Sequence, residues 1–382
     1  MLYLMQRLLL ILPALFAWIA ITWLAGIRTG LLLLLGLGFG AALSGARFGF
    51  ATGWRTLIQD RDPWGMTGQM VLLALCALLA FPLLDRASEE IVGALAPITW
   101  GLMLGALVFG FTMQLADGCG SGTLYKAGAS SPTSWAVLPA FVVGSFFGAS
   151  HLRAWTELGG PLRIVGHSQP DEPVDLIGRI GLGPALFVTI GMCTLIALIS
   201  VAVTARQRWA RGESLPPIPK RWLWGGVAIA LAYAAHLIVA GQPWGIVYGL
   251  GLWGAKIASA VGVDLSQDSF WGTAPHAERL LEPILWDVTS VTNIGLLYGA
   301  LIADRWNLKS FQKPRWPAAS ALVISIAAGL VMGYSSRLAF GCNVGGYLGG
   351  IASASLHGWV WFACAFLGSM VGVRARARAG IA

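Results

Sequence analysis

The chain has 382 residues, of which 57% are hydrophobic and only 11% are charged. A soluble domain carries about 25% charged residues, so this composition excludes a soluble protein and indicates a helical protein that crosses a membrane several times. The net charge of +8 therefore points to orientation in the membrane rather than to nucleic-acid binding, and the absence of a Cys-x-x-Cys pair among the five cysteines argues against a disulfide framework.

Apolar stretches long enough to cross a bilayer recur from one end of the chain to the other. The first follows a single Arg7 and has no clean small-x-small cleavage site after it, so we interpret it as a retained span rather than a signal peptide. Nine spans are expected, at residues 8–25, 67–84, 97–115, 133–150, 183–204, 222–240, 284–303, 318–336 and 357–373. Four glycine-broken apolar segments are expected to form short or re-entrant helices, at residues 29–47, 118–130, 245–262 and 342–355.

The order of spans and broken segments in residues 8–150 recurs in residues 222–373, with one further span between them. An even number of spans in each half, joined by a single linking span, turns the second half upside down relative to the first. The sequence therefore predicts an all-α membrane protein with an inverted repeat. Its parts are a first half at 1–150, a linker at 151–221 that holds the extra span at about 183–204, and a second half at 222–382.

The two halves share a cysteine motif. Leu115–Tyr125 and Leu338–Leu348 both read Leu-Ala-x-Gly-Cys-x-x-Gly, with the cysteines at Cys119 and Cys342. Irregular backbone at membrane depth is tolerated only where it is buried in protein or lines a cavity. Its presence at matching places in two halves indicates a transport site.

A second shared pattern runs from Gly36 to Arg47 and from Gly245 to Lys256, with glycines and a final basic residue at the same offsets. Four broken segments, two from each membrane face, are thus expected to meet near the middle of the membrane. Four basic residues are candidates for charges at the mouths of a pathway, although ordinary interfacial anchoring is the alternative for each of them. They are Arg47, Lys256, Lys126 and Arg337.

With these motifs the chain resembles the YeeE/YedE family of bacterial membrane proteins, which take up thiosulfate. The resemblance covers almost the whole chain and is carried by the two Gly-Cys motifs, by Gly241-Gln-Pro-Trp-Gly245 and by His357-Gly-Trp359. It implies nine transmembrane helices, four short helices and a cysteine relay, with the family's two loop cysteines at Cys119 and Cys342. One position departs from the family, since Gly49 stands where a further cysteine is usual.

A thiosulfate-like dianion that enters an apolar constriction must exchange its water for other partners. Backbone N–H groups at helix N-termini can replace that water, glycines allow close approach, and a neutral thiol adds a weak donor and a soft sulfur. For the loop cysteines the alternative is a small apolar filler, which is the interpretation favoured for Cys76, Cys193 and Cys364. The predicted pathway residues are Cys119, Cys342, Gly118, Gly120, Gly122, Gly341, Asn343, Gly345, Gly346 and Gly49.

Lys and Arg concentrate in the segments that the nine expected spans place on one side, including residues 205–221, 304–317 and 374–378. Because such a bias marks the cytoplasmic side, we expect a bacterial plasma (inner) membrane protein with its C-terminus in the cytoplasm. Nine spans then put the N-terminus outside.

The sequence thus predicts a permease for thiosulfate or a related sulfur anion, with no enzymatic activity, cofactor, metal or nucleic-acid partner. Its expected partners are the anion and the lipid bilayer, and a soluble sulfur-carrier protein at the cytoplasmic face is a further candidate. One alternative, favoured by Gly49, is a permease for another sulfur or selenium species. Others are a membrane redox enzyme that uses the two loop cysteines as a pair, and an anchor subunit whose basic loops bind a soluble protein.

Overall fold

The computed structural model describes residues 2–159, 172–306 and 316–381, and that part of the chain is helical without a β-strand. The first helices are α1 (Leu2–Ala25), α2 (Ile27–Ala46), α3 (Phe50–Arg55), the π-helix η1 (Thr56–Asp60), α4 (Trp64–Arg86), α5 (Trp100–Leu115), α6 (Gly120–Gly128), α7 (Pro132–Ser150) and α8 (Leu152–Gly159). The others are α9 (Leu176–Ile180), α10 (Leu182–Trp209), α11 (Lys220–Ala240), α12 (Ile246–Ala260), α13 (His276–Leu281), the 3-10 helix η2 (Ile284–Trp286), α14 (Val288–Arg305), α15 (Ala319–Leu338), the π-helix η4 (Asn343–Leu348), α16 (Gly349–Ala352) and α17 (Leu356–Arg378). Residues 160–171 of the expected linker and 307–315 of the expected basic segment lie outside the described residues.

Nine helices of the described residues are long and apolar enough to cross a membrane, which confirms the all-α polytopic class. Their set differs from the expected nine in one member. The segment at 29–47 is not broken, since α2 runs without interruption through its glycines and ranks among the nine. Conversely, the helix expected at 284–303 is α14, which is not among them because its 18 residues include the charged Asp304 and Arg305 as well as buried hydroxyl and amide side chains.

The glycines of α2 lie against the backbone of α14, and the helix runs on through them. A Cβ on Gly36 would lie 2.4 Å from the carbonyl oxygen of Thr292, and one on Gly40 would lie 2.0 Å from that of Leu296. The two helices therefore touch backbone to backbone, as small residues allow in membrane proteins. They also run in the same direction, because the later glycine of α2 meets the later residue of α14.

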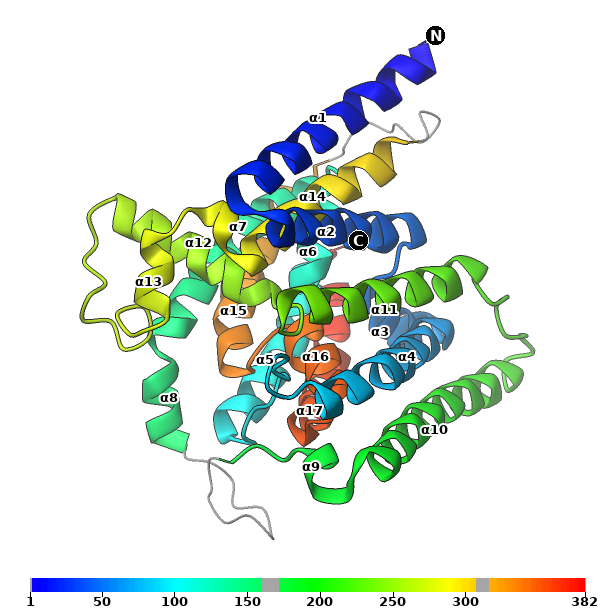
Figure 1. Cartoon of the computed structure of the whole chain (residues 1–382). Helices are drawn as coiled ribbons and strands as arrows, with labels where there is room; N and C mark the ends of the chain where they lie inside the picture. The colour runs from blue at the N-terminus through cyan, green and yellow to red at the C-terminus, as the bar shows by residue number, and fades with distance from the viewer. Residues whose placement is uncertain (1, 160–171, 307–315, 382) are drawn as a thin grey trace.

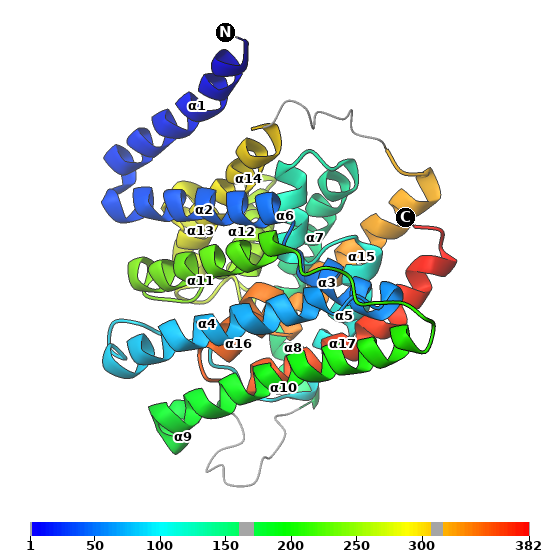
Figure 2. The same cartoon turned by 90° about the vertical axis from the view of Figure 1, so that its right-hand side faces the viewer.

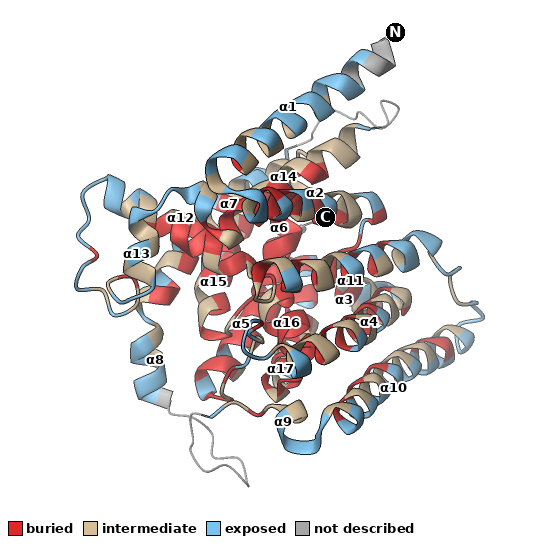
Figure 3. Ribbon diagram, viewed as in Figure 1, coloured by how far each residue is buried: buried red, intermediate tan, exposed pale blue. Residues whose placement is uncertain are grey.

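Two further helix pairs pack in the same way. A Cβ on Gly110 of α5 would lie 1.9 Å from Ala365 O of α17, and one on Gly144 of α7 would lie 2.0 Å from Leu330 O of α15. Figure 1 shows the short helices α3, α6 and α16 within the body that these pairs build, with α1 projecting from it. Buried residues gather on the inner helices α5, α6, α12 and α16, whereas α8 and the outer side of α10 are exposed (Figure 3).

Helices α2, α4, α10 and α11 run between two opposite faces, which Figure 2 shows towards the left and right of the view. We call one the linker face, because it holds the loop at 87–99, helices α8 and α9 and the loop at 262–287. The other, the carboxyl face, holds the loop at 210–219 and the end of α17. Arg28 donates to Val239 O and Ala240 O at the end of α11, which places it on the linker face, whereas Arg7 lies 4.8 Å above the Trp306 ring, just after α14.

Candidate functional site

The two loop cysteines occupy the same place in two similar turns. Each precedes the first residue of a short helix, Cys119 that of α6 and Cys342 that of η4, and their backbone angles agree (φ −82°, ψ −172° and φ −85°, ψ −167°). Two residues earlier, Asp117 (φ 61°) and Phe340 (φ 54°) both have left-handed backbone. The repeated sequence motif is therefore also a repeated backbone conformation.

Gly49 and Gly245 form a second matching pair of helix starts. Gly49 precedes α3 with φ −113° and ψ 123°, and Gly245 precedes α12 with φ −115° and ψ 95°. The sequence pattern instead aligns Gly245 with Gly36, which lies inside the continuous helix α2. Gly49 shares with Gly245 its place directly before a shorter helix.

The two cysteine loops lie against each other. A Cβ on Gly120 would lie 3.0 Å from Cys342 Sγ, so the first residue of α6 touches the second thiol. The N–H groups of Ser121, Val344 and Gly345 face that thiol. Helix N-termini carry partial positive charge and unpaired N–H groups, so an anion at this point would meet two of them at once.

Cys119 has a comparable polar surrounding. Its Sγ lies 3.3 Å from Ser121 Oγ and 3.6 Å from the position of a Cβ on Gly122. Both loop thiols are no more than 1% exposed. The two buried thiols are thus surrounded by backbone amides, a hydroxyl and glycines as well as by apolar side chains.

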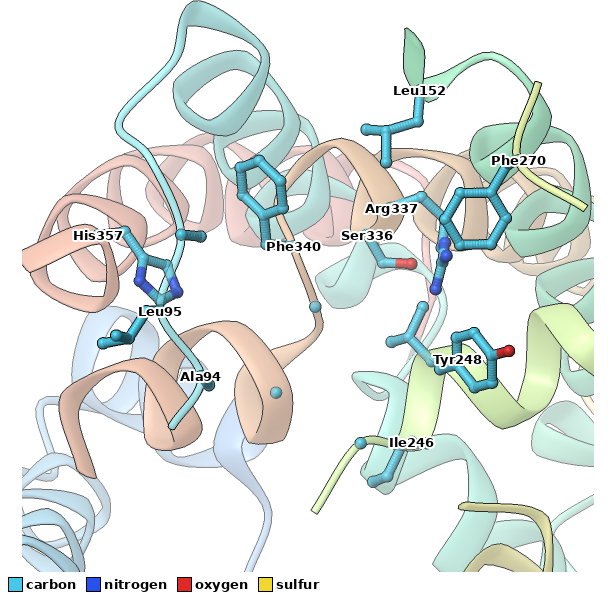
Figure 4. Close-up of a pocket in the computed structure, with 15 residues that line it drawn as sticks. Ala94, Leu95, Leu152, Ile246, Tyr248, Phe270, Ser336, Arg337, Phe340 and His357 are labelled. Atoms are coloured by element: carbon cyan, nitrogen blue, oxygen red, sulfur yellow. The ribbon is translucent and has the colours of Figure 1, made fainter. Parts of the chain in front are cut away.

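A cavity of about 310 Å³ leads from the linker face towards Cys342. Its wall includes Gly245–Tyr248 at the start of α12, and Gly341 and Gly345, which flank the cysteine in sequence. Figure 4 shows Arg337, Tyr248 and Phe270 on one side of it, with Phe340 and His357 on the other. The cavity thus combines a helix start, a guanidinium group and aromatic rings close to the loop that holds Cys342.

Arg337 gives this cavity its charge. Its guanidinium lies 4.8 Å from the centre of the Phe270 ring and 5.7 Å from that of Tyr248, and within the described residues it has no carboxylate partner. His276 stacks on Phe270, and burial together with Arg337 and Arg279 lowers the pKa of its imidazole to about 4. The imidazole is therefore neutral near pH 7, and the positive charge beside the cavity belongs to arginine.

The other three expected mouth charges lie elsewhere. Arg47 is exposed at the left-handed end of α2, and Lys256 donates to Leu280 O and Glu282 O, so neither lines the cavity. Lys126 lies 2.8 Å from Asp117, on the side of Cys119 that faces the carboxyl face. The sequence had not predicted this ion pair.

The remaining predicted glycines shape the two turns. A Cβ on Gly118 would lie 3.1 Å from the backbone of Gly122, and one on Gly346 would lie 2.7 Å from Trp361 Nε1. The same indole nitrogen donates to Gly341 O at 3.2 Å, and Gly341 has φ 145°. Side chains at these positions would collide with the turn or with Trp361.

Asn343 is fully buried beside Cys342, and neither its amide nitrogen nor its amide oxygen has a hydrogen-bond partner in the described part of the chain. Buried amides normally find partners, so this side chain is available to a ligand. Cys76 and Cys193 lie in the same buried core as the two loop cysteines, but each is inside a long apolar helix, α4 or α10, rather than at the start of a short one. Among the described residues there is no group of three His, Cys, Asp or Glu side chains that could hold a metal ion.

Comparison with known proteins yields one family match. The family model described as sulphur transport matches residues 45–371. A thiosulfate transporter TsuA of Spirochaeta thermophila is 26% identical over 333 residues, which is 86% of this chain and 93% of the relative. The Escherichia coli thiosulfate transporter TsuA is 24% identical over 75% of this chain and 81% of its own, and a probable transporter YedE of Salmonella typhimurium is 27% identical over 39% and 36%.

Proposed function

The chain belongs to the sulphur-transport family, and on this premise we propose that it is a permease that takes up thiosulfate or a closely related sulfur anion through the Cys342–Cys119 constriction. The relatives named above are called transporters, and the chain is a multi-pass membrane protein. The observation that carries the proposal is a cavity lined by Arg337, which has no carboxylate partner within the described residues, and by Gly341 and Gly345 on either side of the buried Cys342.

In this proposal the anion first collects in the cavity on the linker face. Arg337 attracts it, and the start of α12 at Gly245 offers unpaired N–H groups. Complete loss of hydration costs an ion tens of kcal/mol in the limiting case, so the constriction must supply replacements for water. The N–H groups of Ser121, Val344 and Gly345 around Cys342 meet that need.

The thiols then allow the anion to leave as well as to bind. A neutral thiol is a weak donor, so each cysteine holds the soft sulfur end of thiosulfate loosely. The third point of contact lacks sulfur: Gly49 begins α3, and a Cβ there would lie 3.2 Å from Tyr125 Oη. A backbone amide and a phenol thus replace the further cysteine that is usual in the family. This difference is the reason why another sulfur or selenium species is the alternative substrate.

For orientation, we propose that the linker face is outside and the carboxyl face is cytoplasmic. The contact of Arg7 with Trp306 supports a cytoplasmic N-terminus as well, in place of the external one expected from nine spans. Counting both α2 and its parallel neighbour α14 as crossings gives the even number that this arrangement needs. Compared with the sequence expectation, Arg7 moves to the cytoplasmic side and Arg28 moves to the outside. The number of Lys and Arg residues on each side is therefore unchanged.

The proposal is tested by uptake of radiolabelled thiosulfate into proteoliposomes, with sulfate and selenite as competitors. Arg337→Gln is expected to raise the KM about tenfold, since loss of a charge contact of this kind costs on the order of 1–3 kcal/mol. Arg86→Gln, an exposed arginine at the end of α4, is the matched control and should leave uptake unchanged.

Three outcomes would contradict parts of the proposal. Chemical consumption of thiosulfate by the detergent-solubilised protein would favour the redox enzyme instead. Stronger competition by selenite than by unlabelled thiosulfate would favour a selenium substrate. Equal effects of the two arginine substitutions would remove the cavity from the pathway. A soluble sulfur carrier at the cytoplasmic face is a separate hypothesis. Uptake into liposomes without added protein would show that transport does not require such a carrier.

A further inference from the structure

The carboxylate of Asp117 is held by three cations from three helices. Its Oδ1 lies 2.9 Å from Arg55 of α3 and 3.1 Å from Arg376 of α17, and its Oδ2 lies 2.8 Å from Lys126 of α6. The carboxylate is 24% exposed, whereas the side chain of Arg376 is only 6% exposed. We call these four residues the Asp117 cluster.

The cluster stands where the other half of the molecule has an opening. Asp117 occupies the left-handed position two residues before Cys119, and the matching residue before Cys342 is Phe340, which lines the cavity on the linker face. On one side of the constriction, then, the turn borders an open cavity. On the other side the equivalent turn inserts a carboxylate among cations.

Two cations of the cluster share one carboxylate. Within the described residues no second carboxylate lies at ion-pair distance from Arg55 or Lys126, so the single negative charge of Asp117 is shared by these two positive charges. The arrangement resembles an anion site, because guanidinium and ammonium groups converge on two oxygens. A doubly charged oxyanion would be attracted to these cations more strongly than a carboxylate at the same distance.

Resting on the proposed function, we propose that the cations of the Asp117 cluster form the exit site for the sulfur oxyanion and that the Asp117 carboxylate occupies this site when the anion is absent. An anion that leaves Cys119 towards the carboxyl face displaces the carboxylate from Arg55, Lys126 and Arg376. Gly118, the next residue, gives the turn the backbone freedom to let the carboxylate move aside. The carboxylate thus closes the exit and excludes anions that compete poorly with it.

The test is inhibition of uptake by sulfate placed on the carboxyl face of proteoliposomes. Asp117→Asn keeps the size of the side chain and removes the competing charge, so the half-inhibitory sulfate concentration should fall about tenfold, a magnitude usual for coupling between two ligands. Asp60→Asn, an exposed carboxylate on the same face with no ion pair in the described chain, is the control and should show no change.

A purely structural cluster gives a different result. Asp117→Asn would then lower the melting temperature and the uptake rate, but the half-inhibitory sulfate concentration would stay the same, and the proposal would be overturned. If Asp117→Asn does not fold, Lys126→Gln replaces it and should raise that concentration, because one of the attracting cations is gone; no increase would also overturn the exit site. Failure of the wild-type protein to move thiosulfate would instead refute the proposed function.

Discussion

The thiols of Cys119 and Cys342 differ from the other buried cysteines in what surrounds them. All belong to one buried core, but Cys119 and Cys342 lie among backbone N–H groups at helix starts, whereas Cys76 lies inside the long apolar helix α4. We therefore expect Cys119→Ala and Cys342→Ala each to reduce thiosulfate uptake at least about tenfold, the effect of one lost contact of roughly 1.4 kcal/mol. Alanine keeps the small volume that the turns require, so melting temperatures in detergent should change little. Cys76→Ala should leave uptake nearly intact, and equal losses at all three positions would favour the role of small fillers.

Gly49 tests whether a third sulfur atom can be added to the pathway. Its φ of −113° is open to any residue, so a side chain brings no backbone strain. A Cβ would lie 3.0 Å from Thr52 Oγ1 and 3.2 Å from Tyr125 Oη, a tight fit that costs on the order of 1 kcal/mol. We expect Gly49→Cys to fold and to raise the preference for thiosulfate over sulfate, as measured by competitive uptake. Gly49→Ala is the control for volume, and identical behaviour of the two variants would show that sulfur has no role here.

At the scale of single elements, helix α2 offers a matched pair of glycines. A Cβ on Gly40 would lie 2.0 Å from Leu296 O of α14, whereas one on Gly38 meets nothing within 4 Å. Gly40→Ala should therefore push α2 and α14 apart and lower the melting temperature clearly. Gly38→Ala should leave it unchanged or raise it slightly, since alanine is favoured over glycine in a helix by up to about 1 kcal/mol. Thermal unfolding in detergent gives both values, and equal shifts would contradict backbone contact between the two helices.

The same helix shows why the sequence predicted some elements and missed others. The apolar stretches and the duplicated cysteine motif are local patterns, so the helical class and the loops at Cys119 and Cys342 were accessible from the sequence. Whether Gly36 and Gly40 break a helix depends on α14, which covers them from a distant part of the chain. The Asp117 cluster depends likewise on Arg55 and Arg376, which approach Asp117 only in the folded protein.

At the scale of the whole molecule, the helix pairs support the proposed inverted repeat. If the halves at 1–150 and 222–382 correspond, α5 matches α15 and α7 matches α17, so the tight pair α5–α17 maps onto the tight pair α7–α15. The turns at Cys119 and Cys342 map onto each other in the same way. The match of Gly49 with Gly245 further favours a correspondence of α3 with α12, and hence of α2 with α11. In that alignment α10, the expected linking span, becomes the counterpart of α1.

This alignment has a consequence for topology that cysteine labelling can test. If α1 and α10 correspond and both α2 and α14 cross the membrane, the two ends of the chain lie on the cytoplasmic side. A membrane-impermeant maleimide added to intact cells should then label Gln267→Cys in the exposed loop of the linker face. It should label Met5→Cys and Ser214→Cys only after the cells are permeabilised. The native background should be low because four of the five cysteines are buried. Labelling of Met5→Cys in intact cells, with Ser214→Cys still protected, would restore an external N-terminus and remove either α2 or α14 from the helices that cross the membrane.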